Sequence, residues 1–453
     1  MKTLELAEQA LKAAEGDEAE ALVHAEHSGV ARFASSEVHQ PTLIDNKGVR
    51  LRIVRNGKVG SAYTNRVDDE GLAELARRAG EVADSARPDP LFPGLAPPAD
   101  VPAVNGYDEE TAALGAGDQA RLAAAAIEGA GDFGLYGYFT SGVTELAVAS
   151  TTGVRDHQAM TDAVCLCLAA VDGKSGWAVR TSSRVSDLTP SEPAEEAAAK
   201  AARTGGAQQI DPGPYRAVLE PYAVADLLTW FAYDSFSGLG FIEERSFLNG
   251  RLGEQAMDEK VSIRDDALDE RGLPKAFDFE GVPKQQVSLV EDGVLKGVVW
   301  DRETAARAGE GVESTGHAPP DAWKYLGPQP FALSMAGGEA GTYDELAELV
   351  GDGIYVTRLH YLSIVQPREG ILTGMTKDGT FRIRDGKVAE PLVNLRFTVA
   401  LPDVLADVPG LTHDPMLVNL NELYDDRFPF AARVPGIATA KFNITGTGSG
   451  PGL

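Results

Sequence analysis

The chain has 453 residues, 43% of them hydrophobic and 24% charged, which is the composition of a folded globular protein and not of a disordered one. Its 68 acidic and 41 basic residues give a formal net charge of −27, which repels phosphate backbones and argues against nucleic-acid binding. The acidic N-terminus is no signal peptide, and no apolar stretch reaches about 18 residues, so we expect a cytoplasmic protein without a membrane span.

Helical and strand-like stretches follow one another through the first half of the chain. Apolar residues at helical spacing predict four helices, at residues 3–14, 68–87, 117–130 and 191–204. Alternating apolar and polar residues predict antiparallel strands, with turns at Asn46-Lys47-Gly48 and Asn56-Gly57. The proline-rich stretch 87–104 is expected to run extended along the surface.

The second half consists mostly of predicted strands. They are joined by expected Asp-Gly turns at Asp292-Gly293, Asp378-Gly379 and Asp385-Gly386. Short helices are predicted near residues 221–234, 301–308 and 343–350. Because helices are interspersed among strands without a regular strand–helix alternation, the pattern predicts an α+β fold with antiparallel sheets.

The glycine- and proline-rich stretch GGAQQIDPGP, residues 205–214, is the best candidate for a domain boundary. It would divide the chain into an N-terminal α+β domain, 1–207, and a mostly-β C-terminal domain, 208–453. Two domains of roughly 200 residues also suit the length of the chain.

Residues that commonly carry catalysis are sparse. Cys165 and Cys167 point to the same side of a predicted strand and fit two small apolar residues on a buried face. His24 and His27 fall on opposite faces of another strand, which suits surface or edge positions better than a shared metal. The sequence has no His-Glu-x-x-His, no His-Glu-x-x-x-His and no Gly-x-Ser-x-Gly. His317 and His360 are the histidines in contexts where a cleft could form, although a structural role is favoured for both.

One stretch raises a specific question. In AVLEPYAVADLLTWFAYDSF, residues 217–236, a short strand is followed by Glu220, by a proline suited to a helix start, and by an apolar helix without histidine. A carboxylate that enters a helix in this way is typical of several metallopeptidases. Apolar residues at Leu227, Leu228 and Phe231 are expected to pack inward.

Several blocks of the chain resemble one protein family. RSFLNGRLGEQ (245–255), FDFEGVPKQQVSLVEDGVLKGVVWD (277–301), ESTGH (313–317) and the long block 356–398 closely resemble the TldD/PmbA family, in its PmbA or TldE branch. RFASSEVHQ, at 32–40, resembles the first block of that family, so the resemblance covers nearly the whole chain. His317 departs from the family pattern, which has asparagine at that place.

The resemblance implies a two-domain α+β protein in a cytoplasmic proteolytic complex. In that complex a TldD-like subunit holds zinc on a His-Glu-x-x-x-His helix and cuts unfolded peptides, and a TldE-like subunit lacks the motif. The matching place here holds Glu220, Pro221 and Ala225, without histidine. Since catalytic zinc needs three protein ligands, we expect no catalytic residue, metal or cofactor in this chain, and zinc in the partner. The chain could also pair with itself when alone.

A peptide substrate would be held by the second domain. Exposed strand edges near VTRLHYLS and GMTKDGTF are expected to bind it by strand addition. Arg358 is the candidate for a carboxylate or carbonyl of the peptide, His360 and Tyr361 for the lining of its site, and Thr373 and Asp378 for a nearby loop.

Two other functions compete with this one. The first is a stand-alone metallohydrolase with an unconventional site built from His317, His360 and an acid. The second is a regulatory protein-binding modulator, as the older family label "modulator of DNA gyrase" suggests, in which the charge of −27 imitates nucleic acid toward a basic partner.

Overall fold

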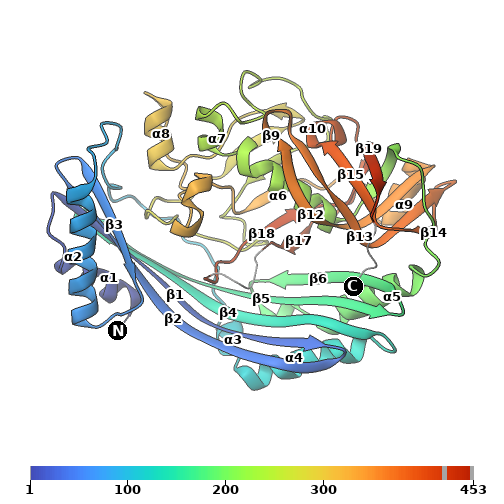
Figure 1. The fold of residues 1–453 in the computed structure, drawn as a ribbon, viewed down its shortest axis with the longest axis horizontal. Helices are drawn as coiled ribbons and strands as arrows, with labels where there is room; N and C mark the ends of the chain where they lie inside the picture. The colour runs from blue at the N-terminus through green and yellow to red at the C-terminus, as the bar shows by residue number, and fades with distance from the viewer. Residues whose placement is uncertain (1, 421–425, 449–453) are drawn as a thin grey trace.

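The computed structural model describes residues 2–420 and 426–448 and has an α+β fold, as the sequence predicted (Figure 1). The first half of the chain forms one antiparallel sheet in the order β3-β2-β1-β4-β5-β6. In chain order its strands are β1 (Glu18–Ala34), β2 (Glu37–Arg55), β3 (Lys58–Thr64), β4 (Gly134–Ser150), β5 (Arg155–Val171) and β6 (Lys174–Ser182).

Helices cover one face of this sheet. They are α1 (Thr3–Lys12), α2 (Asp69–Ser85), α3 (Glu109–Ala112), α4 (Ala116–Gly129) and α5 (Ser191–Arg203), and the four longer ones confirm the predicted helices. Because side chains alternate between the two faces along β1, every second residue of this strand faces the helices. Ala21 and Val23 pack toward α1 and α2, whereas Leu22 faces the second half of the chain.

The second half forms two further sheets. The first has the order β10-β9-β8-β11-β18-β17. Its strands are β8 (Ile263–Asp265), β9 (Val287–Glu291), β10 (Val294–Leu295), β11 (Leu333–Met335), β17 (Met416–Asn419) and β18 (Ala431–Val434). The other has the order β12-β7-β19-β15-β13-β14, and an additional pairing between β12 and β13 closes five of its strands into a ring. Its strands are β7 (Gly213–Leu219), β12 (Gly353–Gln366), β13 (Ile371–Arg384), β14 (Lys387–Leu392), β15 (Leu395–Ala400) and β19 (Ile437–Thr447), with β16 (Gly410–Leu411) paired to β19.

The helices of the second half are α6 (Pro221–Ser235), α7 (Gly238–Ile242), α8 (Arg302–Ala308), α9 (Tyr343–Val350) and α10 (Leu401–Val404). Short 3-10 turns occupy Val185–Asp187, Asp321–Leu326 and Pro367–Glu369. Helices α6, α8 and α9 confirm the three predicted ones. Leu227, Leu228 and Phe231 of α6 are buried, as expected, and most other residues of this helix are buried as well, which is typical of a helix enclosed on all sides.

Two predicted turns are wrong. Asn46-Lys47-Gly48 lies inside β2, where it pairs with β1. The chain instead turns at Ser35-Ser36, whose φ angles of 49° and 61° are both left-handed. Asp378-Gly379 lies inside β13 beside an irregularity in its pairing with β12, and not in a turn. The turns at Asn56-Gly57, Asp292-Gly293 and Asp385-Gly386 are confirmed, each with left-handed φ at both residues.

The described ranges contain no helix with the length and hydropathy that crossing a membrane requires. All six strands of the first sheet lie before residue 183, and all strands of the other two lie after residue 212. The division into domains 1–207 and 208–453 stays a prediction, because side chains from both halves pack in the same core cluster.

Candidate functional site

Glu220 lies between β7 and α6, where the backbone changes from strand to helix. It is the residue before the first turn of α6, with Pro221 at the helix start. The residue is only 1% exposed. Oε2 lies 2.7 Å from Nζ of Lys200, on α5, and Oε1 accepts a hydrogen bond of 2.6 Å from the hydroxyl of Tyr355, on β12. Both carboxylate oxygens are therefore occupied by donors of this chain.

The contact with Lys200 belongs to a larger ionic cluster. Lys200 also pairs with Glu196 at 2.6 Å, and Arg180 pairs with Glu196 at 2.7 Å. The hydroxyl of Tyr222 lies between them, 3.0 Å from Arg180 and 3.1 Å from Glu196. Two acids and two bases balance in charge, so the cluster is neutral while all four are ionised.

Burial and neighbouring charges shift the pKa values of this cluster. Burial raises the pKa of Glu220, although the charge of Lys200 works in the opposite direction. Burial opposes the charge on Lys200, but the carboxylates of Glu220 and Glu196 outweigh it and raise the pKa of the ammonium group. Lys200 therefore keeps its charge, and it keeps it directly against Glu220.

Zinc does not fit this place. The resemblance puts the zinc motif of a TldD-like subunit in the strand–helix stretch 217–231, which holds Glu220, Pro221 and Ala225 and no histidine. Here Glu220 is a carboxylate bound to an ammonium group, and Ala225 carries a methyl group that cannot bind metal. A cation at Glu220 would have to displace Lys200 and would lie close to its positive charge.

The structure joins Arg358 with Asp378, two of the residues predicted to contact a peptide. Nε of Arg358 donates to Oδ2 of Asp378 at 2.7 Å, and Oδ1 accepts from the hydroxyl of Ser175, on β6, at 2.7 Å. The guanidinium also lies over the ring of Trp177, 4.9 Å from its centroid. Asp378 is 2% exposed and lies in β13 and not in a loop, so this pair connects the first sheet with the ring of strands.

The other three predicted residues lie apart from this pair. Thr373 donates to the carbonyl of Phe397 at 2.7 Å, within the sheet. His360 and Tyr361 lie at an irregularity of β12, with ring centroids 4.2 Å apart, and Tyr361 is 80% exposed at a left-handed φ of 51°. Burial, together with the charges of Lys377 and Arg358, lowers the pKa of His360. Their part in substrate binding stays a prediction.

The expected strand edges differ from those observed. β13 pairs with β12 on one side and with β15 and β14 on the other, so GMTKDGTF is not an edge. β12 pairs with β7 only at Ile354–Val356, and α6 packs against β12. Asp226 of α6 accepts a hydrogen bond from the backbone of Leu359, and burial raises the pKa of this carboxyl to about 7. Strand addition is therefore not supported at GMTKDGTF, and at VTRLHYLS it stays a prediction.

His317 is a buried structural histidine. It is 0% exposed, its Nε2 lies 2.8 Å from Oδ1 of Asp265, and its Nδ1 lies 2.9 Å from the hydroxyl of Thr315. Neither ring nitrogen is free to bind a metal. Among residues 2–420 and 426–448 no group of three or more histidine, cysteine, aspartate or glutamate side chains is arranged to hold a metal ion. The geometry gives no support to a site built from His317 and His360.

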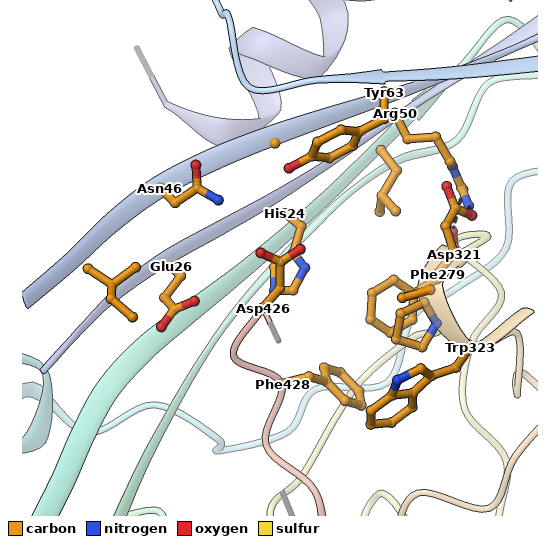
Figure 2. Close-up of a pocket in the computed structure, with 15 residues that line it drawn as sticks. His24, Glu26, Asn46, Arg50, Tyr63, Phe279, Asp321, Trp323, Asp426 and Phe428 are labelled. Carbon is orange, nitrogen blue, oxygen red and sulfur yellow. Dashed lines mark hydrogen bonds and ion pairs between the residues drawn. The ribbon is translucent and has the colours of Figure 1, made fainter. Parts of the chain in front are cut away.

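A cavity of about 540 Å³ lies between the first sheet and the second half of the chain (Figure 2). Its polar lining includes His24, which the sequence placed at a surface or edge position. That expectation is wrong, because β1 is a central strand and His24 faces the second half of the chain. Trp323 and Phe428, which also line the cavity, were not singled out by the sequence, because they come from segments without a recognisable motif.

Comparison with known proteins agrees with the resemblance seen in the sequence. Residues 212–446 match the model of the PmbA/TldA metallopeptidase C-terminal domain, and residues 19–83 match that of PmbA/TldA metallopeptidase domain 1. A protein named metalloprotease from Methanothermobacter thermautotrophicus is 27% identical over 391 residues, which are 81% of this chain and 82% of that protein.

Solved structures share the fold. TldE from Thermococcus kodakarensis superposes with a TM-score of 0.84 at 19% identity, covering 98% of this chain and 99% of that one. A putative modulator of a DNA gyrase from Thermotoga maritima superposes with a TM-score of 0.80 at 20% identity, covering 94% and 96%. With family models matching both halves, and one of them spanning more than half of the sequence, the chain belongs to the PmbA/TldD family of metallopeptidases.

Proposed function

We propose that this chain is the metal-free subunit of a two-subunit cytoplasmic metallopeptidase, and that a zinc-bearing relative with a His-Glu-x-x-x-His helix cuts unfolded peptides in the complex. The observation that carries the proposal is the ion pair between Lys200 and Glu220 in the histidine-free stretch that resembles the place of the zinc helix. Cys165 and Cys167 are buried free thiols, which agrees with a reducing compartment.

The ion pair argues against a latent metal site in physical terms. Removing Lys200 from a carboxylate that is 1% exposed would leave a buried charge without its partner, which costs about 3–5 kcal/mol. A divalent ion would have to compensate this loss with a single carboxylate ligand and without either histidine of the zinc motif. The likeness in fold to TldE of Thermococcus kodakarensis, at 19% identity, is consistent with the proposal but carries less weight.

The test is to purify the chain alone, a family member with the zinc motif alone, and the two together. We expect the chain alone to contain far less than one zinc per molecule and to leave an unfolded peptide uncut. The mixture should co-elute as one complex, hold zinc and cut the peptide, and a chelator should abolish the cleavage. Stoichiometric zinc and chelator-sensitive cleavage by the chain alone would contradict the proposal. Size-exclusion chromatography of the chain alone also shows whether it pairs with itself.

A further inference from the structure

The cavity in Figure 2 has an apolar side built from aromatic rings. Phe279 and Phe428 pack against each other with centroids 5.0 Å apart, and Trp323 lies beside them. Phe279 and Phe428 belong to the buried cluster between the two halves of the chain, and Trp323 is half-buried at its border. A ligand that enters the cavity therefore meets fixed aromatic faces. Such faces bind apolar groups and also attract cations.

The polar side of the cavity offers a hydrogen-bond acceptor at His24. Its Nε2 lies 2.9 Å from the carbonyl oxygen of Arg427, and because a carbonyl only accepts, Nε2 carries the proton. Burial lowers the pKa of His24 and keeps the ring neutral, so Nδ1 is left as an acceptor. Within the described ranges no donor reaches Nδ1.

Charges around the cavity are predominantly negative. Among the described residues, its lining holds the carboxylates of Glu26, Asp321 and Asp426 and a single cationic side chain, Arg50. Arg50 is already engaged, with Asp321 at 2.6 Å, with the buried Glu20 at 2.9 Å and with the carbonyl of Phe279 at 2.8 Å.

The three carboxylates differ in how they are used. Glu26 accepts from the hydroxyl of Ser28 and, at 2.9 Å, from the backbone N–H of Arg427, so it is part of the frame of the cavity. Asp426 is exposed, and no cation among the described residues pairs with it. Figure 2 shows its carboxylate beside His24. Burial lowers the pKa of His24 and raises that of Tyr63, and the charge of Asp426 works to raise both. Asp426 is thus the carboxylate of the described lining that is available to pair with a ligand.

We propose that this cavity binds an organic cation, with its ammonium or guanidinium group against Asp426 and His24 and its apolar part on Phe279, Trp323 and Phe428. An ammonium group has only donors, which matches the acceptors of the polar side. An anion would meet Asp426, and the part of the lining that the structure describes has no free cation to offset that charge. A free amine has this chemistry, and so does the N-terminus of a peptide that begins with an apolar residue. The peptide source rests on the proposed function, whereas binding of the cation does not.

The first experiment uses the full chain alone and isothermal titration calorimetry. Phenethylamine and 3-phenylpropionate have similar size and opposite charge. We expect the amine to bind saturably at one site and the acid not to bind. Asp426→Asn should weaken binding of the amine about tenfold, because it removes a charged hydrogen-bond acceptor. Trp323→Ala should weaken it at least tenfold, through the loss of aromatic contact. Circular dichroism confirms that both variants are folded.

A matched control and a second pair of ligands complete the test. Asp132→Asn removes an exposed carboxylate outside the cavity and should leave binding unchanged. The peptide Phe-Gly-Gly-amide and its N-acetylated form separate the two sources. Binding of only the free peptide, as tight as that of phenethylamine, supports a peptide N-terminus, and binding of phenethylamine alone supports a small amine.

Three outcomes would overturn the proposal: no saturable binding of either cation, equal binding of the acid and the amine, or unchanged affinity in both Asp426→Asn and Trp323→Ala. Neither zinc nor a partner subunit enters this measurement. If the cation does not bind, the proposal of a metal-free subunit still stands. If the zinc assay fails, the proposal that the cavity binds a cation still stands.

Discussion

The ammonium group of Lys200 lies 2.7 Å from the carboxylate of Glu220. This ion pair connects α5, the last helix of the first half of the chain, to the residue that directly precedes α6. The pair is nearly inaccessible to water on the Glu220 side, where the side chain is 2% exposed, and 14% exposed on the Lys200 side. Breaking this pair therefore affects the stability of the fold more than breaking an exposed ion pair would.

Breaking this pair should be costly, and removing both charges should not. We expect Lys200→Met to lower the free energy of unfolding by about 3–5 kcal/mol, because Glu220 keeps a buried charge without its cation. The double variant Lys200→Met with Glu220→Gln should recover most of the loss. Urea denaturation of the wild type, both single variants and the double variant measures the coupling.

The matched control is Lys296→Met, which breaks an exposed pair with Glu291. This control should change the free energy of unfolding by less than about 1 kcal/mol. A Lys200→Met variant that is as stable as the control would show that the pair contributes little and would remove the main physical support for the metal-free site.

Arg358 was predicted to contact substrate, and in the structure it also pairs with the buried carboxylate of Asp378. Experiments have to separate this structural role from substrate binding. We expect Arg358→Ala to lower the free energy of unfolding by about 3 kcal/mol, because Asp378 is left buried with only the hydroxyl of Ser175. Adding Asp378→Asn should restore stability. The sequence-based expectation is that Arg358→Ala also lowers peptide cleavage by the complex while assembly stays intact.

Cleavage by the double variant distinguishes the two roles of Arg358. If activity returns together with stability, the arginine acts through the packing of β12 against β6. If the double variant is stable and assembled but still slow, Arg358 contacts the peptide. Wild-type cleavage by the single variant Arg358→Ala would remove it from the site altogether.

The buried Lys275 should make stability depend on pH. Its side chain is 1% exposed, its ammonium group donates to the carbonyl of Leu273 at 2.8 Å, and burial, together with the nearby charge of Lys284, lowers its pKa to about 7. The unfolded chain keeps a lysine pKa near 10.4. Between these two values the unfolded state binds a proton that the folded state lacks, so stability rises with pH.

The measurement compares wild type with Lys275→Met in urea at several pH values. From pH 7 to pH 9 the wild type should gain about 2–3 kcal/mol relative to the variant, and little should change below pH 7, where both states hold the proton. The same substitution at the exposed Lys387 should leave the pH dependence as it is in the wild type. Parallel curves for wild type and Lys275→Met would contradict the prediction.

Cys165 and Cys167 should be inert in the folded protein. Both are 0% exposed, with sulfur atoms 3.8 Å apart, which confirms the buried strand face expected from the sequence. The second sulfur, and then burial, raises the pKa of the Cys167 thiol, which suppresses the reactive thiolate. Ellman's reagent should detect no thiol in the native chain and two after denaturation. A rapid reaction of either thiol in the native chain would show that this face of the sheet opens.

Local sequence patterns predicted much of the secondary structure. The helices and the Asn56-Gly57 turn depend on residues close in sequence, so periodicity and turn chemistry were enough to find them. The turn at Ser35-Ser36 was missed because serine carries no strong signal for a left-handed φ. Asp378-Gly379 was assigned to a turn because the dipeptide is the same whether it ends a strand or lies at an irregularity inside one.

By itself the sequence determined the fold class, the family and the place of Glu220 at the start of an apolar helix that lacks histidine. It did not determine which residues bind the carboxylate of Glu220, because these are remote in sequence: Lys200 is 20 residues away and Tyr355 is 135 residues away. Tyr355 lies on β12, which comes next to Glu220 only because β12 pairs with β7. The cavity is likewise a product of tertiary structure, since His24, Trp323 and Asp426 come from distant segments. Contacts between remote segments depend on how the sheets pair and pack, and no local pattern encodes that pairing.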